Sequence, residues 1–202
     1  MKFKNDLKYL WIYFKWQILA AVIVVILAFH FLITAFSEKE CALSIMLLDC
    51  YTEVGDEEME KELLQSLQLD KKKYVIEVQN GLMIDNTESG SYAMTSLSRL
   101  MSDIGSEKLD VCGMLQESFL KYDHSRTFLD LRECFTEEQL NEIGEALLVT
   151  EDGRVIGIYA DALNKLQEDG CYDSEDEKGV VGIVYNTKHL DMAVNYLLYL
   201  MD

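Results

Sequence analysis

The sequence predicts an α/β fold: an N-terminal transmembrane helix followed by one three-layer α/β domain with a mostly parallel sheet. Three observations lead to this prediction. A long uncharged apolar run lies near the N-terminus, short apolar runs typical of buried strands follow it, and amphipathic segments with helical spacing separate those runs. The 202 residues are enough for one domain with its own core besides the apolar run. We therefore expect a basic N-terminus at 1–15, an anchor at 16–36 and an α/β domain at 37–202.

The expected anchor is the run WQILAAVIVVILAFHFLITAF at 16–36, which contains no Asp, Glu, Lys or Arg. At about 1.5 Å per residue, a helix of this length would cross a bilayer core of about 30 Å. Four lysines precede the run, and the positive-inside rule then predicts a cytoplasmic N-terminus. We expect a single-pass protein of the cell membrane with an extracellular C-terminal domain. A cleaved signal peptide is the alternative, but Ala35-Phe36-Ser37 is a poor cleavage site.

The first half of the domain alternates strands and helices. Residues 42–51 are a short apolar run typical of a buried parallel strand, and 56–69 carry apolar side chains at helical spacing after an acidic first turn. Residues 74–84 alternate as a strand does, and 92–104 again have helical spacing. A short strand at 109–114 and a short helix at 115–122 complete this half.

The second half begins with Thr136-Glu-Glu-Gln139, which has the spacing of a capping box. We expect a helix from there towards Leu147. Strands are predicted at 155–159, after the turn Glu151-Asp-Gly-Arg154, and at 180–185. An amphipathic helix at 190–201 closes the expected order of elements. This alternation favours a mostly parallel sheet.

Composition limits the partners of the protein. The chain has 36 acidic and 18 basic residues, a formal net charge of −18, so nucleic acid is not an expected partner. Half of the residues are hydrophobic, which excludes a disordered chain, and the lack of proline excludes proline-rich recognition tails. The five cysteines cannot all pair within one chain, and none has the C-x-x-C spacing of zinc or redox sites. Which cysteines form a disulfide stays open.

Motifs for catalysis are not found in the sequence. It contains no G-x-S-x-G, GxxxxGK[ST] or G-x-G-x-x-G motif. The acidic run 173–177 fails as a calcium loop, because Lys178 and Val184 occupy the positions of the required Gly and Glu. We expect no enzyme, no catalytic residue, no cofactor and no metal site.

Three segments in order carry a resemblance to a known family. Residues 109–143 read LDVCGMLQESFLKYDHSRTFLDLRECFTEEQLNEI, 153–157 read GRVIG, and 186–200 read NTKHLDMAVNYLLYL. This order resembles the type 2 periplasmic (extracellular) solute-binding proteins. GRVIG is similar to their "GkvyGiP" crossing strand, and 186–200 is similar to their "NSKNpeaAakFleyL" helix, which packs back on the first lobe.

The departures from that family change what the resemblance implies. A complete member has a second lobe of about a hundred residues between the crossing strand and the closing helix, whereas this chain has only 160–179 there. The proline of the crossing motif is replaced by Tyr159. The resemblance therefore implies a single lobe, without the two-lobed clamp that encloses a solute.

Two functions follow as hypotheses. The first is an interaction module that docks on a protein partner, such as a transporter permease, as a transporter accessory. The second is weak binding or sensing of a small polar solute at the loop ends of the sheet, where open α/β sheets place ligands. The candidate ligand-binding side chains are Asn86, Thr87, Ser89, Ser91 and Glu117.

Overall fold

The structure is a computed structural model that describes residues 15–17, 19–31, 39–50, 52, 54–84, 90–172 and 178–201. The chain forms two compact units, Met1–Lys39 and Glu40–Asp202.

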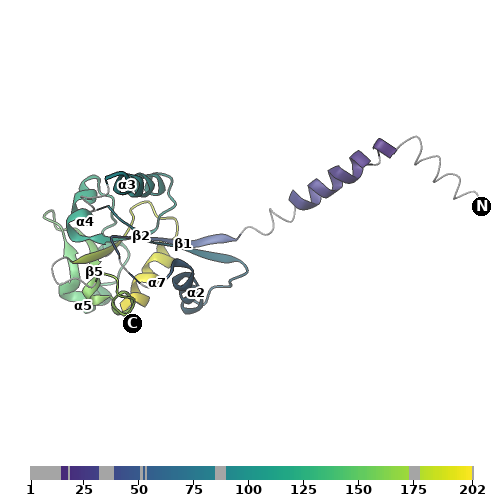
Figure 1. The fold of residues 1–202 in the computed structure, drawn as a ribbon. Coiled ribbons are helices and arrows are strands. Elements are labelled where there is room, and N and C mark those ends of the chain that lie inside the picture. The colour runs from purple at the N-terminus through teal and green to yellow at the C-terminus, as the bar shows by residue number, and fades with distance from the viewer. Residues whose placement is uncertain are drawn as a thin grey trace, which may run out of the picture. The chain divides into compact units, whose positions relative to one another are not determined.

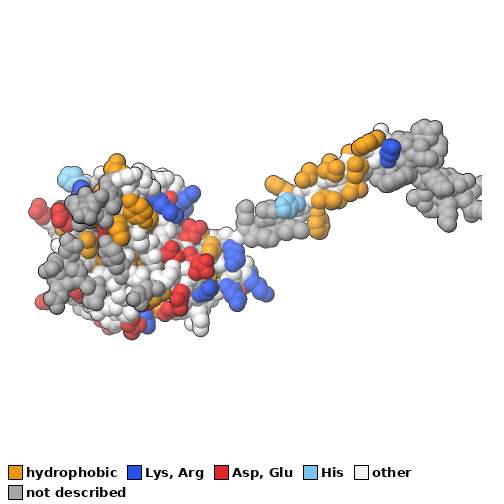
Figure 2. Space-filling view, viewed as in Figure 1, with side chains coloured by type: hydrophobic (Ala, Val, Ile, Leu, Met, Phe, Trp, Pro, Cys, Tyr) orange, Lys and Arg blue, Asp and Glu red, His pale blue; other side chains and the backbone are white. Residues whose placement is uncertain are grey.

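In the first unit, residues 15–17 and 19–31 are helical, and their side chains are exposed (Figure 2). Among the described residues, no helix is both long enough and apolar enough to cross a membrane. The predictions of a transmembrane anchor at 16–36 and of a single-pass membrane location are therefore wrong. Residues 18 and 32–36 of the expected anchor lie outside the described residues.

The second unit is an α/β domain. Its strands are β1 (Glu40–Leu48), β2 (Tyr74–Leu82), β3 (Val111–Leu115), β4 (Leu147–Val149), β5 (Val155–Tyr159) and β6 (Gly179–Ile183). Its α-helices are α2 (Asp56–Ser66), α3 (Gly90–Gly105), α4 (Gln116–Tyr122), α5 (Glu137–Ile143), α6 (Asn164–Glu168) and α7 (Leu190–Met201). Short 3₁₀ turns η1 (Asp123–Ser125), η2 (Leu131–Glu133), η3 (Gly144–Ala146) and η4 (Ala160–Ala162) join them.

The six strands form one sheet in the order β2-β1-β3-β6-β5-β4. β1 pairs in parallel with β2 and β3, whereas β3 with β6, β6 with β5 and β5 with β4 are antiparallel pairs. The sheet is thus mixed, and the prediction of a mostly parallel sheet is wrong. The physical reason is β6: the chain enters it from the carboxyl edge of β3 and runs back between β3 and β5.

Helices cover both faces of the sheet, giving the expected three layers. Successive side chains of β1 point to opposite faces: Leu43, Ile45 and Leu47 pack with α2 and α7, and Met46 and Leu48 pack with α3 and α4. Figure 1 shows α3 and α4 on one side of the sheet and α2, α5 and α7 on the other.

Most predicted elements lie within a few residues of the observed ones. The strand at 155–159 and the helix at 190–201 match β5 and α7. The capping box is also confirmed: the Thr136 N–H donates to Gln139 Oε1 at 2.9 Å, and the Gln139 N–H donates to Thr136 Oγ1 at 3.2 Å. The helix that this box starts ends at Ile143, because the chain turns through Gly144 at φ 57° and enters β4.

Candidate functional site

Two of the five predicted solute residues, Ser91 and Glu117, are described by the structure. Asn86, Thr87 and Ser89 lie outside the described residues. Ser91 lies in the first turn of α3 and Glu117 in the first turn of α4, and both are exposed. Neither residue lines either of the two hollows described below.

The carboxyl edge of the parallel strands is covered by residues 169–172, which we name the Tyr172 strap. A buried disulfide joins Cys171 of the strap to Cys50, just beyond β1. The backbone carbonyl of Asp169 accepts a hydrogen bond from the Thr52 hydroxyl. The Tyr172 hydroxyl donates to the carbonyl of Leu48 at 2.8 Å. Three separate links therefore hold the strap against the end of β1.

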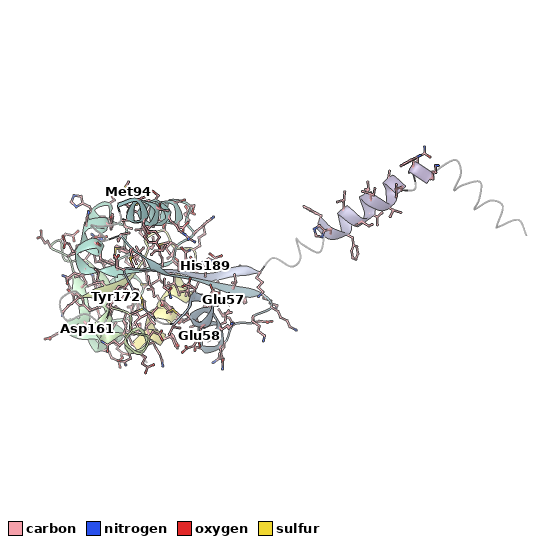
Figure 3. The ribbon with its side chains drawn as sticks, in the orientation of Figure 1. Glu57, Glu58, Met94, Asp161, Tyr172 and His189 are labelled. Atoms are coloured by element: carbon pink, nitrogen blue, oxygen red, sulfur yellow. A yellow bond between two sulfur atoms is a disulfide. The ribbon has the colours of Figure 1, made fainter. Side chains whose placement is uncertain are left out.

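Tyr172, labelled in Figure 3, packs closely at this edge. Its side chain is buried, and its backbone is left-handed, with a φ of 59°. The ring lies against Gly179, where an added Cβ would be 2.3 Å from Tyr172 Cγ, and its hydroxyl lies close to Gly113. Burial raises the phenol pKa well above its ordinary value, so the hydroxyl stays protonated and continues to donate. Tyr172 thus packs against the ends of β1, β3 and β6 at this edge.

A second polar cluster lies around Asp110, which directly precedes β3; it includes His189, which Figure 3 labels. This carboxylate is buried and accepts hydrogen bonds from the Ser44 N–H at 2.8 Å and the Thr187 hydroxyl at 2.6 Å. His189 Nδ1 lies 3.0 Å from Asp110 Oδ2. His189 directly precedes α7, so the cluster fixes the start of that helix to β1 and β3.

The surroundings of Asp110 do not form a nucleophilic site. Cys41 lies near enough for its pKa to be influenced by Asp110, but burial first, and then Glu77 and Asp110, raise that pKa to about 11. Its thiol is therefore protonated at neutral pH and a poor nucleophile. Among the described residues, no group of three or more His, Cys, Asp or Glu side chains is placed to hold a metal ion. We interpret the Asp110 cluster as structural.

One flank of α7 carries apolar side chains that are only partly covered by the core. A hollow of about 320 Å³ lies beside it; its lining residues are Gln139, Glu142, Ile143, Ala162, Leu198 and Met201. A second, shallow hollow of about 20 Å³ lies on the other flank, between α7, α2 and α6. Leu190, Val194, Leu198 and Met201 are exposed or half-buried at spacings of four, four and three, so they form one stripe along the helix.

Carboxylates border both hollows. Glu142 lines the larger one, while Glu62 and Asp169 line the smaller one beside Lys165. Burial raises the pKa of Asp169, and the negative charges of Glu62 and Glu168 raise it further. Lys165 opposes this effect, but its ammonium group is already bonded to Glu168 at 2.9 Å. The apolar face of α7 is therefore bordered by crowded negative charge.

The sequence alone could not predict this surface, because only the folded arrangement of the elements brings its side chains together. The hollow combines side chains from α5, η4 and α7, three elements that are separated from one another in the chain. One signal was present: α7 has a single charged residue, Asp191, in an otherwise highly charged protein.

Comparisons with known proteins identify no relative. No protein-family model matches the chain, and no curated protein or solved structure matches it either. The resemblance to solute-binding proteins stays a prediction.

Proposed function

We propose that the α/β domain is an interaction module that binds a protein partner on the outer side of α7. The observation that carries this proposal is the apolar stripe of α7 beside a hollow of about 320 Å³. Apolar surface that is exposed, concave and bordered by polar groups is typical of protein-binding sites. An apolar side chain of a partner that entered the hollow would remove Ile143, Leu198 and Met201 from water.

The stripe has the geometry that helix packing requires. Side chains four and three residues apart form a ridge, and a neighbouring helix packs its own ridge alongside. Leu190, Val194, Leu198 and Met201 continue such a ridge along the whole of α7. Because α7 is also fixed to the sheet through the Asp110 cluster at one end, its stripe is held in place before a partner arrives, and less ordering is needed on binding.

The packing of the carboxyl edge supports protein binding over the alternative, a small polar solute. A solute site must be concave and must bury most of its ligand. Tyr172 occupies this edge, and the disulfide at Cys171 ties the strap in place. The proposed single lobe binds a flat or convex partner without closing around it.

Site-directed photocrosslinking tests the proposal. A photoreactive amino acid replaces Glu142 at the hollow, or Glu151 in the exposed turn before β5 as the control, in cells that make the full-length chain. We expect a discrete protein adduct from position 142 and none from position 151. Adducts from position 151 alone, or from neither position, would contradict the proposal.

A further inference from the structure

The charge around α7 indicates what kind of partner fits there. The larger hollow has Glu142 on its wall, and Glu138 lies one helical turn earlier on the same side of α5. On the opposite flank of α7, Glu62 and Asp169 line the smaller hollow, and Glu58 and Glu168 are close enough to act on Asp169. The stripe of α7 thus runs between two acidic borders.

The border at the smaller hollow brings like charges together when the domain is alone. Burial first, and then the negative charges of Glu62 and Glu168, raise the pKa of Asp169. Lys165 is the one cation that lines either hollow in the described structure, and it is paired with Glu168. A partner with positive charge on both sides of an apolar strip would relieve the repulsion and would gain attraction as water leaves.

We propose that the partner presents a cationic amphipathic helix. Its apolar side chains pack against the α7 stripe and enter the hollow beside Leu198, and its lysine or arginine side chains face Glu142 on one border and Glu62 on the other. This is the helix-in-groove mode of recognition, in which apolar residues at helical spacing supply affinity and the flanking charges supply selectivity. The inference rests on the proposed function, because it names the partner of the same surface.

Three synthetic peptides of about 18 residues, long enough to form a helix, test this inference. All have leucines at the same helical spacing, and the remaining positions are lysine, glutamine or glutamate. Binding to the full-length chain is measured by fluorescence anisotropy. We expect the lysine peptide to bind at least about tenfold more tightly than the glutamine peptide, and its affinity to fall as salt rises. The glutamate peptide is expected to bind most weakly.

Two charge reversals locate the site. Glu142→Lys lies at the hollow, whereas Glu151→Lys lies in the turn at the far end of β5 and is the matched control. Both side chains are exposed, so neither variant should unfold the domain. We expect Glu142→Lys to weaken binding of the lysine peptide about threefold or more and Glu151→Lys to change it less than about twofold.

The outcomes separate the two proposals. Equal affinity for the lysine and glutamine peptides, with Glu142→Lys lacking any effect, overturns the cationic partner but leaves the apolar docking surface. Equal weakening by Glu142→Lys and Glu151→Lys also overturns this inference, because it indicates attraction to the net charge of the whole protein. Failure of all three peptides to bind with a Kd below about 100 µM overturns both proposals.

Discussion

Truncation of Tyr172 should show that the carboxyl edge of the sheet is closed by packing. The ring is buried against Gly179 and Gly113, and the hydroxyl bonds to the Leu48 carbonyl. Tyr172→Phe keeps the ring and loses one hydrogen bond, which costs about 1 kcal/mol. Tyr172→Ala also empties the space under the strap, and loss of a large buried aromatic side chain costs about 3–5 kcal/mol.

The backbone of Tyr172 supplies an internal check on this prediction. At a φ of 59°, alanine is as strained as tyrosine, whereas glycine is not. Tyr172→Gly should therefore be as stable as Tyr172→Ala or more so, by up to about 1 kcal/mol, although it removes one more carbon.

Chemical denaturation of the full-length chain measures these effects. Far-ultraviolet circular dichroism is the suitable signal, because both tryptophans, Trp11 and Trp16, precede the domain in the sequence. The reasoning is refuted if Tyr172→Ala lies within about 1 kcal/mol of the unaltered chain, or if Tyr172→Ala is clearly more stable than Tyr172→Gly.

Three further predictions concern stability. Asp110→Ala should lower the free energy of unfolding by about 3–5 kcal/mol, since it strands the Ser44 N–H and removes the partners of Thr187 and His189; a loss below about 1 kcal/mol in the same denaturation assay would contradict this. Replacing both Cys50 and Cys171 with serine should lower the free energy of unfolding by about 2–5 kcal/mol, because the disulfide joins residues 121 apart in the chain. A reducing agent should lower the stability of the unaltered chain and leave that of the double variant unchanged. The raised pKa of Asp169 means that the folded protein favours the protonated carboxyl, so ionisation there lowers stability as pH rises from its ordinary value of 3.8 through the higher folded-state pKa. Asp169→Asn removes this loss, and its stability relative to the unaltered chain should increase over that pH range; a difference that does not change with pH would contradict it.

Local patterns in the sequence predict most of the elements, because local forces determine them. The apolar spacing of Met59 and Leu63 indicates α2, and both side chains are buried as that spacing requires. Thr136 and Gln139 form their capping box entirely within one turn. In both cases the residues that decide the structure are also neighbours in the sequence.

Strand direction and the docking surface depend on distant contacts, so sequence patterns could not supply them. An apolar run such as 180–185 is compatible with either direction, and β6 is antiparallel only because of where α6 and the Tyr172 strap leave the chain. The pairing of Cys50 with Cys171 similarly joins two ends of the fold. β4 was missed because three residues are too few for a recognisable alternation. The anchor at 16–36 was predicted from hydrophobicity alone, and no helix among the described residues is both long enough and apolar enough to cross a membrane.

The most direct test of partner binding beside α7 fills the hollow and measures its effect on the crosslink. Ala162 lies on the wall of the 320 Å³ hollow, so Ala162→Trp adds a side chain that occupies this space without removing any core contact. The yield of the protein adduct from a photoreactive amino acid at position 142 is compared with and without Ala162→Trp. The proposed docking predicts at least about a tenfold loss of adduct in a variant that denatures like the unaltered chain. An unchanged yield of the adduct in the Ala162→Trp variant would contradict the proposed docking.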